Sequence, residues 1–306
     1  MQERRRALAA AVAGSALWGL SGTAGQVVLQ GYLFPVWGLV TIRMLGASML
    51  LFVIARPKWP RPWTWSFASM AIFGLVGSQV TYLEALFYSN VTTSTLLQFL
   101  FLPMVAAYEL STRAIRWSAG WAVLLTFAAA GTILLVGTFS SYGFSILITP
   151  LGLVFGLLSA VAGAYYTLAN RRFVQTESAW WVTTWGFLLG GIVTAPIGAW
   201  SLLEYRWPTS VASGALLAGL VLFMVVAGTL LAFTLFVYGL RNLKATEAGI
   251  AGSFEPIVAA AAGFAILGVT LSAFQYVGGG LIIVAVALLG ASIHRRSEPT
   301  QRVAPP

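Results

Sequence analysis

Four ionisable side chains lie inside long apolar stretches of the sequence: Arg43, Glu84, Glu247 and Glu255. A charge within a membrane-spanning segment is costly unless it faces water or a partner. Each of these residues is therefore a candidate for binding a solute, for carrying a coupling proton, or for a structural ion pair. Glu247 has a simpler explanation, because a carboxylate at the start of a helix is stabilised by the helix dipole.

Arg43 and Glu84 could serve transport directly or could form an ion pair with each other. The planar guanidinium of Arg43 suits a bidentate pair with a substrate carboxylate, whereas Glu84 could bind an amine or carry a coupling proton. Glu255 precedes Pro256, whose missing N–H can kink a helix and free carbonyl groups toward a cavity. We therefore expect Glu255 to line the pathway of a solute.

Uncharged polar side chains follow helical spacing in two neighbouring apolar stretches. Gln79 and Tyr82 are three residues apart, which places them on one face of a helix. Ser94, Gln98 and Phe101 follow the same rule in the next stretch, although hydrogen bonds between packed helices would explain both patterns equally well. The candidate solute-binding residues are Ser78, Gln79, Tyr82, Gln98, Phe101, Tyr165, Phe254 and Glu255.

The side chains that metal and nucleophilic chemistry require are scarce. The sequence has no Cys, no Asp and a single His, His294, in the polar C-terminal end. No G-x-x-x-x-G-K-[ST] motif is present, so we do not expect ATP hydrolysis. We expect no catalytic residue, no metal site and no cofactor, and an intramembrane enzyme is the less favoured alternative.

The composition indicates that these residues lie in a membrane. Of 306 residues, 59% are hydrophobic and 8% are charged, whereas a soluble domain carries about 25% charged residues. Continuous apolar stretches of about 20 residues can cross a bilayer as helices. Ten are predicted, at residues 7–28, 34–54, 66–87, 92–110, 117–138, 150–173, 179–203, 213–240, 246–268 and 273–293.

The basic residues predict the orientation of these spans. Loops that face the cytoplasm are enriched in Lys and Arg. All 17 Lys and Arg residues fall on one side of the predicted membrane, except Arg43 within a span and Arg206 on the other side. Both termini are therefore predicted to be cytoplasmic, and the net charge of +9 requires no nucleic-acid partner.

Two short similarities within the chain indicate an internal repeat. Residues 101–107 (FLPMVAA) resemble residues 254–260 (FEPIVAA), and residues 15–19 (SALWG) resemble residues 159–163 (SAVAG). Because five helices per half is an odd number, the halves would have opposite orientations. We expect an all-α integral membrane fold of ten transmembrane helices in two inverted five-helix repeats (5+5). The predicted parts are a first repeat at 1–138, an extracytoplasmic linker at 139–149, a second repeat at 150–293 and a cytoplasmic tail at 294–306.

Small motifs also follow one another in a recognisable order: Trp18-Gly19, Pro35 with Arg43, Ala85-Leu86, Pro103, Ser159-Ala160 with Tyr165, Gly239-Leu240 and Glu255-Pro256. Their order and spacing resemble the drug/metabolite transporter superfamily, in its ten-helix EamA-like branch. The Gly-Glu pair that this family usually has near the end of the ninth helix is replaced by Gly268-Val269. The resemblance implies a carrier of metabolites in the inner (plasma) membrane, often an exporter of amino acids.

Together these features predict a secondary transporter that exports amino acids, aromatic or other neutral ones among them, or related metabolites by alternating access. The main alternative is efflux of multiple drugs or cationic compounds, and a channel is less favoured. The expected partners are a small-molecule solute and the lipid bilayer. The run Gly278-Gly279-Gly280 could pack against a helix of the same chain or against a second copy in a homodimer.

Overall fold

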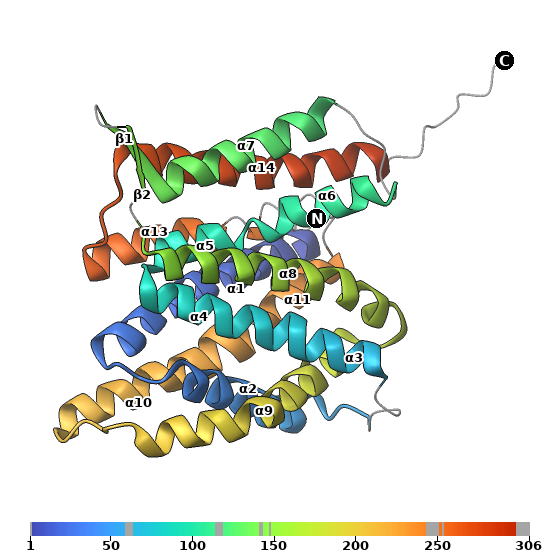
Figure 1. The fold of residues 1–306 in the computed structure, drawn as a ribbon. Coiled ribbons are helices and arrows are strands. Elements are labelled where there is room, and N and C mark those ends of the chain that lie inside the picture. The colour runs from blue at the N-terminus through green and yellow to red at the C-terminus, as the bar shows by residue number, and fades with distance from the viewer. Residues whose placement is uncertain are drawn as a thin grey trace.

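The computed structural model describes residues 2–58, 64–113, 119–140, 143–146, 148–242, 251–252 and 254–297. Long helices cross the molecule side by side and in alternating directions (Figure 1). The elements up to residue 136 are α1 (Gln2–Gln26), η1 (Val27–Gly31), α2 (Val36–Ala55), α3 (Trp65–Ser69), η2 (Met70–Val76), α4 (Gly77–Tyr88), α5 (Val91–Gln98), α6 (Phe101–Ser111) and α7 (Ala119–Val136).

A short hairpin separates these helices from the rest. Its strands are β1 (Gly137–Ser140) and β2 (Gly143–Ile146), which pair antiparallel. The helices that follow are α8 (Pro150–Thr176), α9 (Ala179–Glu204), α10 (Val211–Val225), η3 (Val226–Leu231), α11 (Ala232–Asn242), α13 (Phe254–Leu267) and α14 (Ala273–Ser297). The hairpin is a departure from the expectation of an all-α fold, because extended backbone at Gly137–Ser140 pairs with that at Gly143–Ile146.

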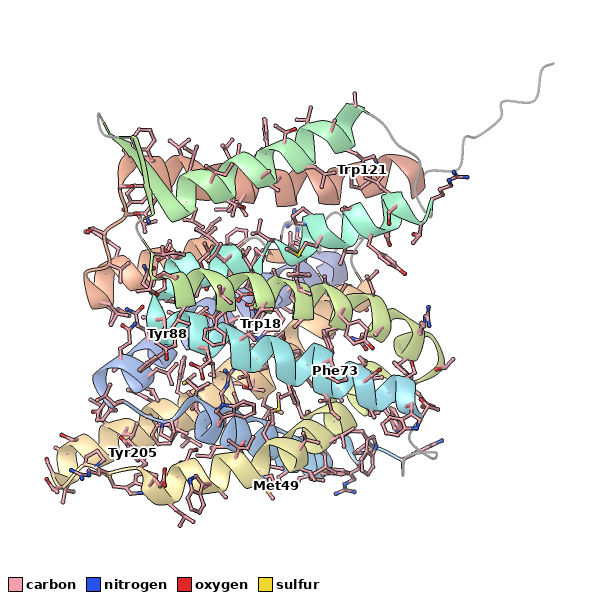
Figure 2. All side chains as sticks on the ribbon, viewed as in Figure 1. Trp18, Met49, Phe73, Tyr88, Trp121 and Tyr205 are labelled. Atoms are coloured by element: carbon pink, nitrogen blue, oxygen red, sulfur yellow. The ribbon has the colours of Figure 1, made fainter. Side chains whose placement is uncertain are left out.

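The helix lengths agree with a protein that crosses the membrane several times. Within the described residues, seven helices are long and apolar enough to span a bilayer, and Ala119–Leu135, Phe254–Leu267 and Ala273–Ala285 are shorter apolar helices. The outer surface is apolar as well: Met49, Phe73 and Trp200 are 63%, 69% and 65% exposed, and Figure 2 shows Met49 and Phe73 on the outside of the bundle. Such exposure suits lipid, so the prediction of a helical, multi-pass membrane protein is confirmed.

Polar residues set the helix boundaries where the sequence suggests them. The side chain of Asn90 accepts a hydrogen bond from the Thr93 backbone N–H at 2.9 Å and so caps α5. Thr149 caps α8 in the same way, with Pro150 as the first helical residue. Gly268 ends α13 at a φ of 65°, a left-handed conformation that glycine adopts without strain. These local signals explain why most predicted ends lie within a few residues of the observed ones.

Helices from distant parts of the chain pack in pairs. α7 and α14 lie side by side at one edge of the bundle, and α2 packs against α9 at the opposite edge (Figure 1). Between them, α1 packs against α11 and α13, while α8 packs against α4, α5 and α6. Small residues allow the closest approaches: a Cβ at Gly131 would lie only 2.7 Å from the carbonyl oxygen of Gly278. Gly278 therefore packs against a helix of its own chain.

Four spans depart from regular α-helix. The π-helical segments η2 and η3 interrupt the spans that contain α4 and α11, and η1 ends the first span. The fourth span is divided, because α5 ends at Gln98 and α6 begins at Phe101, two residues before Pro103. Proline cannot donate a helical hydrogen bond, which accounts for the interruption next to it. The helical stripe predicted through Ser94, Gln98 and Phe101 therefore crosses a turn, which corrects the assumption of one continuous helix.

Candidate transport site

The middle of α1 brings several other helices together through its small residues. A Cβ at Gly19 would lie 2.7 Å from the carbonyl oxygen of Glu255 in α13, and one at Gly22 would lie 2.6 Å from the Tyr82 hydroxyl in α4. Gly19 and Gly22 are one turn apart and share a face of α1. Between them, the Ser21 side chain contacts Gly228 of η3. These contacts gather α4, α13 and η3 around one stretch of the first helix.

Tyr82 is buried at the centre of this arrangement. Its side chain is 8% exposed, and its hydroxyl lies 3.1 Å from the Thr95 hydroxyl of α5. Ser78, one turn earlier, is also buried and donates to the carbonyl of Leu75 at 3.3 Å. Gln79 is half-buried and its side chain makes no hydrogen bond to another described residue. The face proposed from sequence is therefore buried at Ser78 and Tyr82.

Arg43 is buried in α2 with few acceptors around its guanidinium. The side chain is 8% exposed, and its Nε donates to the Thr229 hydroxyl of η3 at 3.3 Å. Thr229 in turn donates to the carbonyl of Met224 at 2.8 Å. Among the described residues Arg43 forms no ion pair, with Glu84 or with any other carboxylate.

The two candidate carboxylates occupy different surroundings. Glu255 is the second residue of α13 and is partly buried. Its carbonyl oxygen packs against Gly19, one turn from the glycine that packs on the Tyr82 hydroxyl. Glu84 is half-buried in α4 and has no basic partner within the described part of the chain. Contacts with α1 thus place Glu255 and Tyr82 on one face of that helix.

A run of hydroxyl side chains in α5 borders the cluster. Thr92, Thr93, Ser94 and Thr95 are each 1% exposed or less. The hydroxyls of Thr93 and Ser94 have no hydrogen-bond partner among the described residues, which is unusual for buried polar atoms. Sequence reasoning singled out Ser94 alone, although four consecutive hydroxyl residues in an apolar span were a signal. Thr229 carried no comparable signal, because its role depends on a π-helical segment and a distant arginine.

The other predicted residues have different surroundings. Phe101 packs against Gly163 of α8, and Gln98 is half-buried at the end of α5. Tyr165 is 40% exposed and its hydroxyl lies 2.8 Å from that of Ser69. Phe254 is 38% exposed. Within the described part of the chain no hydrogen bond joins these four side chains to one another, and Glu247 lies outside the described residues.

A second polar network lies at the end of the same first span. The Gln30 side chain in η1 donates to the carbonyls of Leu86, Phe87 and Ser89 at 2.9, 3.0 and 2.9 Å. Gln30 also accepts from the Gln26 amide at 3.0 Å. The Gln26 carbonyl oxygen accepts from the backbone N–H of Val91, the first residue of α5, at 2.8 Å. These bonds tie the end of the first span to the end of α4 and the start of α5.

Comparison with known proteins places this arrangement among membrane transporters. Residues 150–291 match the EamA-like transporter family. This match to the second half of the chain agrees with the resemblance found in the sequence. The match covers α8 to α14, including the helix that carries Glu255.

Similar proteins extend the likeness over the whole chain. The chain is 26% identical to "Uncharacterized inner membrane transporter YicL" of Salmonella typhimurium, over 97% of this chain and 99% of that protein. It is 23% identical to "Uncharacterized transporter YwfM" of Bacillus subtilis, over 90% of each chain. A solved crystal structure superposes with a TM-score of 0.62 at 18% identity, covering 95% of this chain and 99% of the other. That likeness shows a shared fold.

Proposed function

We propose that the protein is a secondary transporter of the inner (plasma) membrane that exports amino acids or related small metabolites by alternating access. The observation that carries this proposal is the buried polar cluster around Tyr82, which is built where helices of both halves of the chain meet. Arg43 and Tyr82 come from the first half, and Thr229 and Glu255 come from the second. A site between two halves that move against each other can open to either side of the membrane.

Two inverted repeats of five spans, at 1–138 and 150–293, are supported by how the helices pack. If each span is matched with the span five places away, α1 corresponds to α8, α11 to α4 and α13 to α6. The packing of α1 on α11 and α13 then corresponds to the packing of α8 on α4 and α6. The pairs α2–α9 and α7–α14 exchange with themselves. At the crossing of α2 and α9, the hydroxyl of Thr41 donates a hydrogen bond to the hydroxyl of Thr194 at 2.9 Å, and the two residues are 153 positions apart. The sequence similarity of 101–107 to 254–260 has the same offset.

The interruptions of the helices agree with this symmetry. α6 begins two residues before Pro103, and α13 begins two residues before Pro256. Gly74 in η2 packs against Tyr166 of α8, and Gly228 in η3 packs against Ser21 of α1. In each case a π-helical segment of one half meets the first helix of the other half. The repeats therefore support ten spans, and the excess of basic residues at one set of helix ends supports cytoplasmic termini, with 139–149 outside and 294–306 inside.

The chemistry of the cluster favours amino acids over the alternative solutes. One basic side chain, Arg43, and one acidic side chain, Glu255, belong to helices that gather with Tyr82 on the same stretch of α1, which suits a solute with a carboxylate and an ammonium group. Efflux of cationic drugs is the second candidate, because Glu255 alone could attract a cation. A buried Arg43 in the same region would oppose a cation, so this alternative is less well supported.

The proposal is tested with the purified protein in liposomes loaded with a panel of labelled amino acids. We expect efflux above that from empty vesicles for at least one neutral amino acid. Replacing Tyr82 by Ala should reduce the flux while leaving membrane yield intact, and the same test applies to Gln79. A panel without any flux, together with Glu255-dependent movement of a cationic dye, would replace amino-acid export by drug efflux.

A further inference from the structure

A basic and an acidic side chain, Arg43 and Glu255, lie around the stretch of α1 that packs on Tyr82. Glu255 packs against Gly19 and Tyr82 against Gly22, while Arg43 bonds Thr229, which follows the glycine of η3 that packs on α1. No ion pair joins Arg43 to Glu255 among the described residues. An arginine and a glutamate that had only a structural role would be expected to neutralise each other directly, because an unpaired charge in a buried setting is costly. Their separation leaves both charged ends available to a third group.

Arg43 has the unused donors that a carboxylate needs. A guanidinium carries five N–H donors in a planar fork. In the described part of the chain, one of them is used, by the Nε bond of 3.3 Å to Thr229. That bond fixes the orientation of the side chain through a hydroxyl that is itself held by the carbonyl of Met224. The remaining donors suit a bidentate bond to a carboxylate.

Glu255 is held in place by its backbone. Its carbonyl oxygen packs directly against Gly19 of α1, and Gly22 on the same face of α1 packs against the Tyr82 hydroxyl. The two glycines therefore set the position of α13 relative to Tyr82. No Lys, Arg or His of the described residues forms an ion pair with Glu255. A carboxylate at a helix start is stabilised by the helix dipole, but that effect alone would not require a basic residue in the same region.

We propose that Arg43, Tyr82 and Glu255 form a binding site for the zwitterionic end of a free α-amino acid. Arg43 binds the carboxylate, Glu255 binds the ammonium group, and the Tyr82 hydroxyl, paired with Thr95, borders the same site. This site rests on the proposed function and assigns to it a specific substrate group. It selects against compounds with one charge, because an anion leaves Glu255 unpaired and a cation leaves Arg43 unpaired.

The test compares three forms of the same molecule. The probes are L-phenylalanine and L-leucine, each with its N-acetyl derivative, which keeps only the negative charge, and its amide, which keeps only the positive charge. Each probe competes with efflux of the labelled amino acid from liposomes that contain the full chain. The native protein should prefer the free amino acid over either derivative by roughly tenfold or more, as expected for loss of a hydrogen bond to a charged group.

Each substitution should then remove one preference and leave the other. Glu255→Gln should abolish the preference over the N-acetyl derivative, and Arg43→Met should abolish the preference over the amide. Matched controls are Glu204→Gln and Arg206→Gln, since both residues are exposed at the end of α9. Neither control should change the order of the three ligands. Arg43→Met replaces a charge that has no ion-pair partner among the described residues by an apolar chain of similar length, so folding is expected. If the variant fails to fold, the Glu255→Gln comparison decides alone.

Three outcomes separate this inference from the function on which it rests. Selective loss of one preference in each variant supports the site. Efflux of amino acids by the native protein, with equal weakening of all three ligands in both variants, would assign Arg43 and Glu255 to structure and leave amino-acid export intact. A native protein that moves neither the tested amino acids nor others in the panel would remove the proposed function and the site together.

Discussion

Two polar regions lie along the first span, and they differ in how fully their hydrogen bonds are satisfied. At η1, the Gln30 amide donates to three carbonyl oxygens, and the Gln26 side chain both donates and accepts. Around Tyr82, the guanidinium of Arg43 has one acceptor in the described part of the chain. Figure 2 shows Tyr88, the last residue of α4 and a neighbour of the residues that Gln30 contacts, near one end of the bundle. Trp18 of α1 lies within the bundle in the same view.

This difference separates a structural network from a binding site. Buried polar groups in a network with every partner present hold helices in one arrangement. A buried group that lacks partners costs free energy, and a ligand can supply the missing bonds. The η1 network therefore joins the first span to α4 and α5, while the Tyr82 cluster keeps capacity for a solute. Substitutions in the two regions should consequently affect different measurements.

The largest effect is expected from closing the space between α1 and α13. In Gly19→Ala the new Cβ would lie 2.7 Å from Glu255 O and 2.9 Å from Ala259 N, both backbone atoms. Overpacking of this kind costs about 1–3 kcal/mol, and the shift of α13 should also reduce efflux. The control is Gly219→Ala, since nothing lies within 4 Å of its Cβ position. Equal melting temperatures and equal fluxes in the two variants would contradict the role of Gly19.

The η1 network should respond in stability more than in solute preference. Gln30→Leu keeps the size of the side chain but leaves the carbonyls of Leu86, Phe87 and Ser89 without this donor. We expect a loss of about 1–3 kcal/mol, seen as a lower melting temperature in detergent. Gln79→Leu is the matched control, because Gln79 makes no side-chain hydrogen bond to a described residue. A larger loss of stability in Gln79→Leu than in Gln30→Leu would contradict the structural role of the η1 network.

Thr229→Val tests whether Arg43 is oriented by η3. The substitution preserves shape and removes the acceptor of the Arg43 Nε, so the affinity for the amino acid should fall by roughly three- to tenfold, as for one lost hydrogen bond. Thr234→Val is the control, because the hydroxyl of Thr234 donates to the Leu230 carbonyl within the same span. Concentration dependence of efflux gives the affinity. Similar changes in both variants would point to a general effect on the span.

The smallest effect is expected for the bond between Tyr82 and Thr95. Tyr82→Phe removes one hydroxyl from a pair 3.1 Å apart, which should cost about 1 kcal/mol of stability. Thr95→Val should cost a similar amount. The double variant should lose less than the sum if the two hydroxyls bond each other. Strict additivity in thermal unfolding would show that the two side chains act independently.

Much of the fold could be predicted because its signals are local. Apolar run length predicted the helical spans, and residues such as Asn90 and Pro150 marked where helices begin. The hairpin at β1 and β2 was missed, because glycine, serine and aromatic residues around 139–146 resemble an ordinary loop. The turn between α5 and α6 was also missed, since Pro103 was noted only as a position in the repeat.

The candidate site was predictable only in part. Burial cost identified Arg43 and Glu255 as residues that need a reason to lie in a membrane span. Helical spacing connected Tyr82 to Gln79 on the same element. It could not connect Tyr82 to Gly22 or to Thr95, because those contacts are made between helices and depend on how the helices cross.

The sequence by itself determined that the chain is a helical membrane protein, where most spans begin and end, and which charges lie inside them. These properties follow from hydrophobicity and capping, which act within one segment. Only the tertiary structure decided that Arg43 meets Thr229, 186 residues away, rather than Glu84. It also decided that Glu255 and Tyr82 pack on one face of α1, because close packing through Gly19 and Gly22 selects which distant residues can touch.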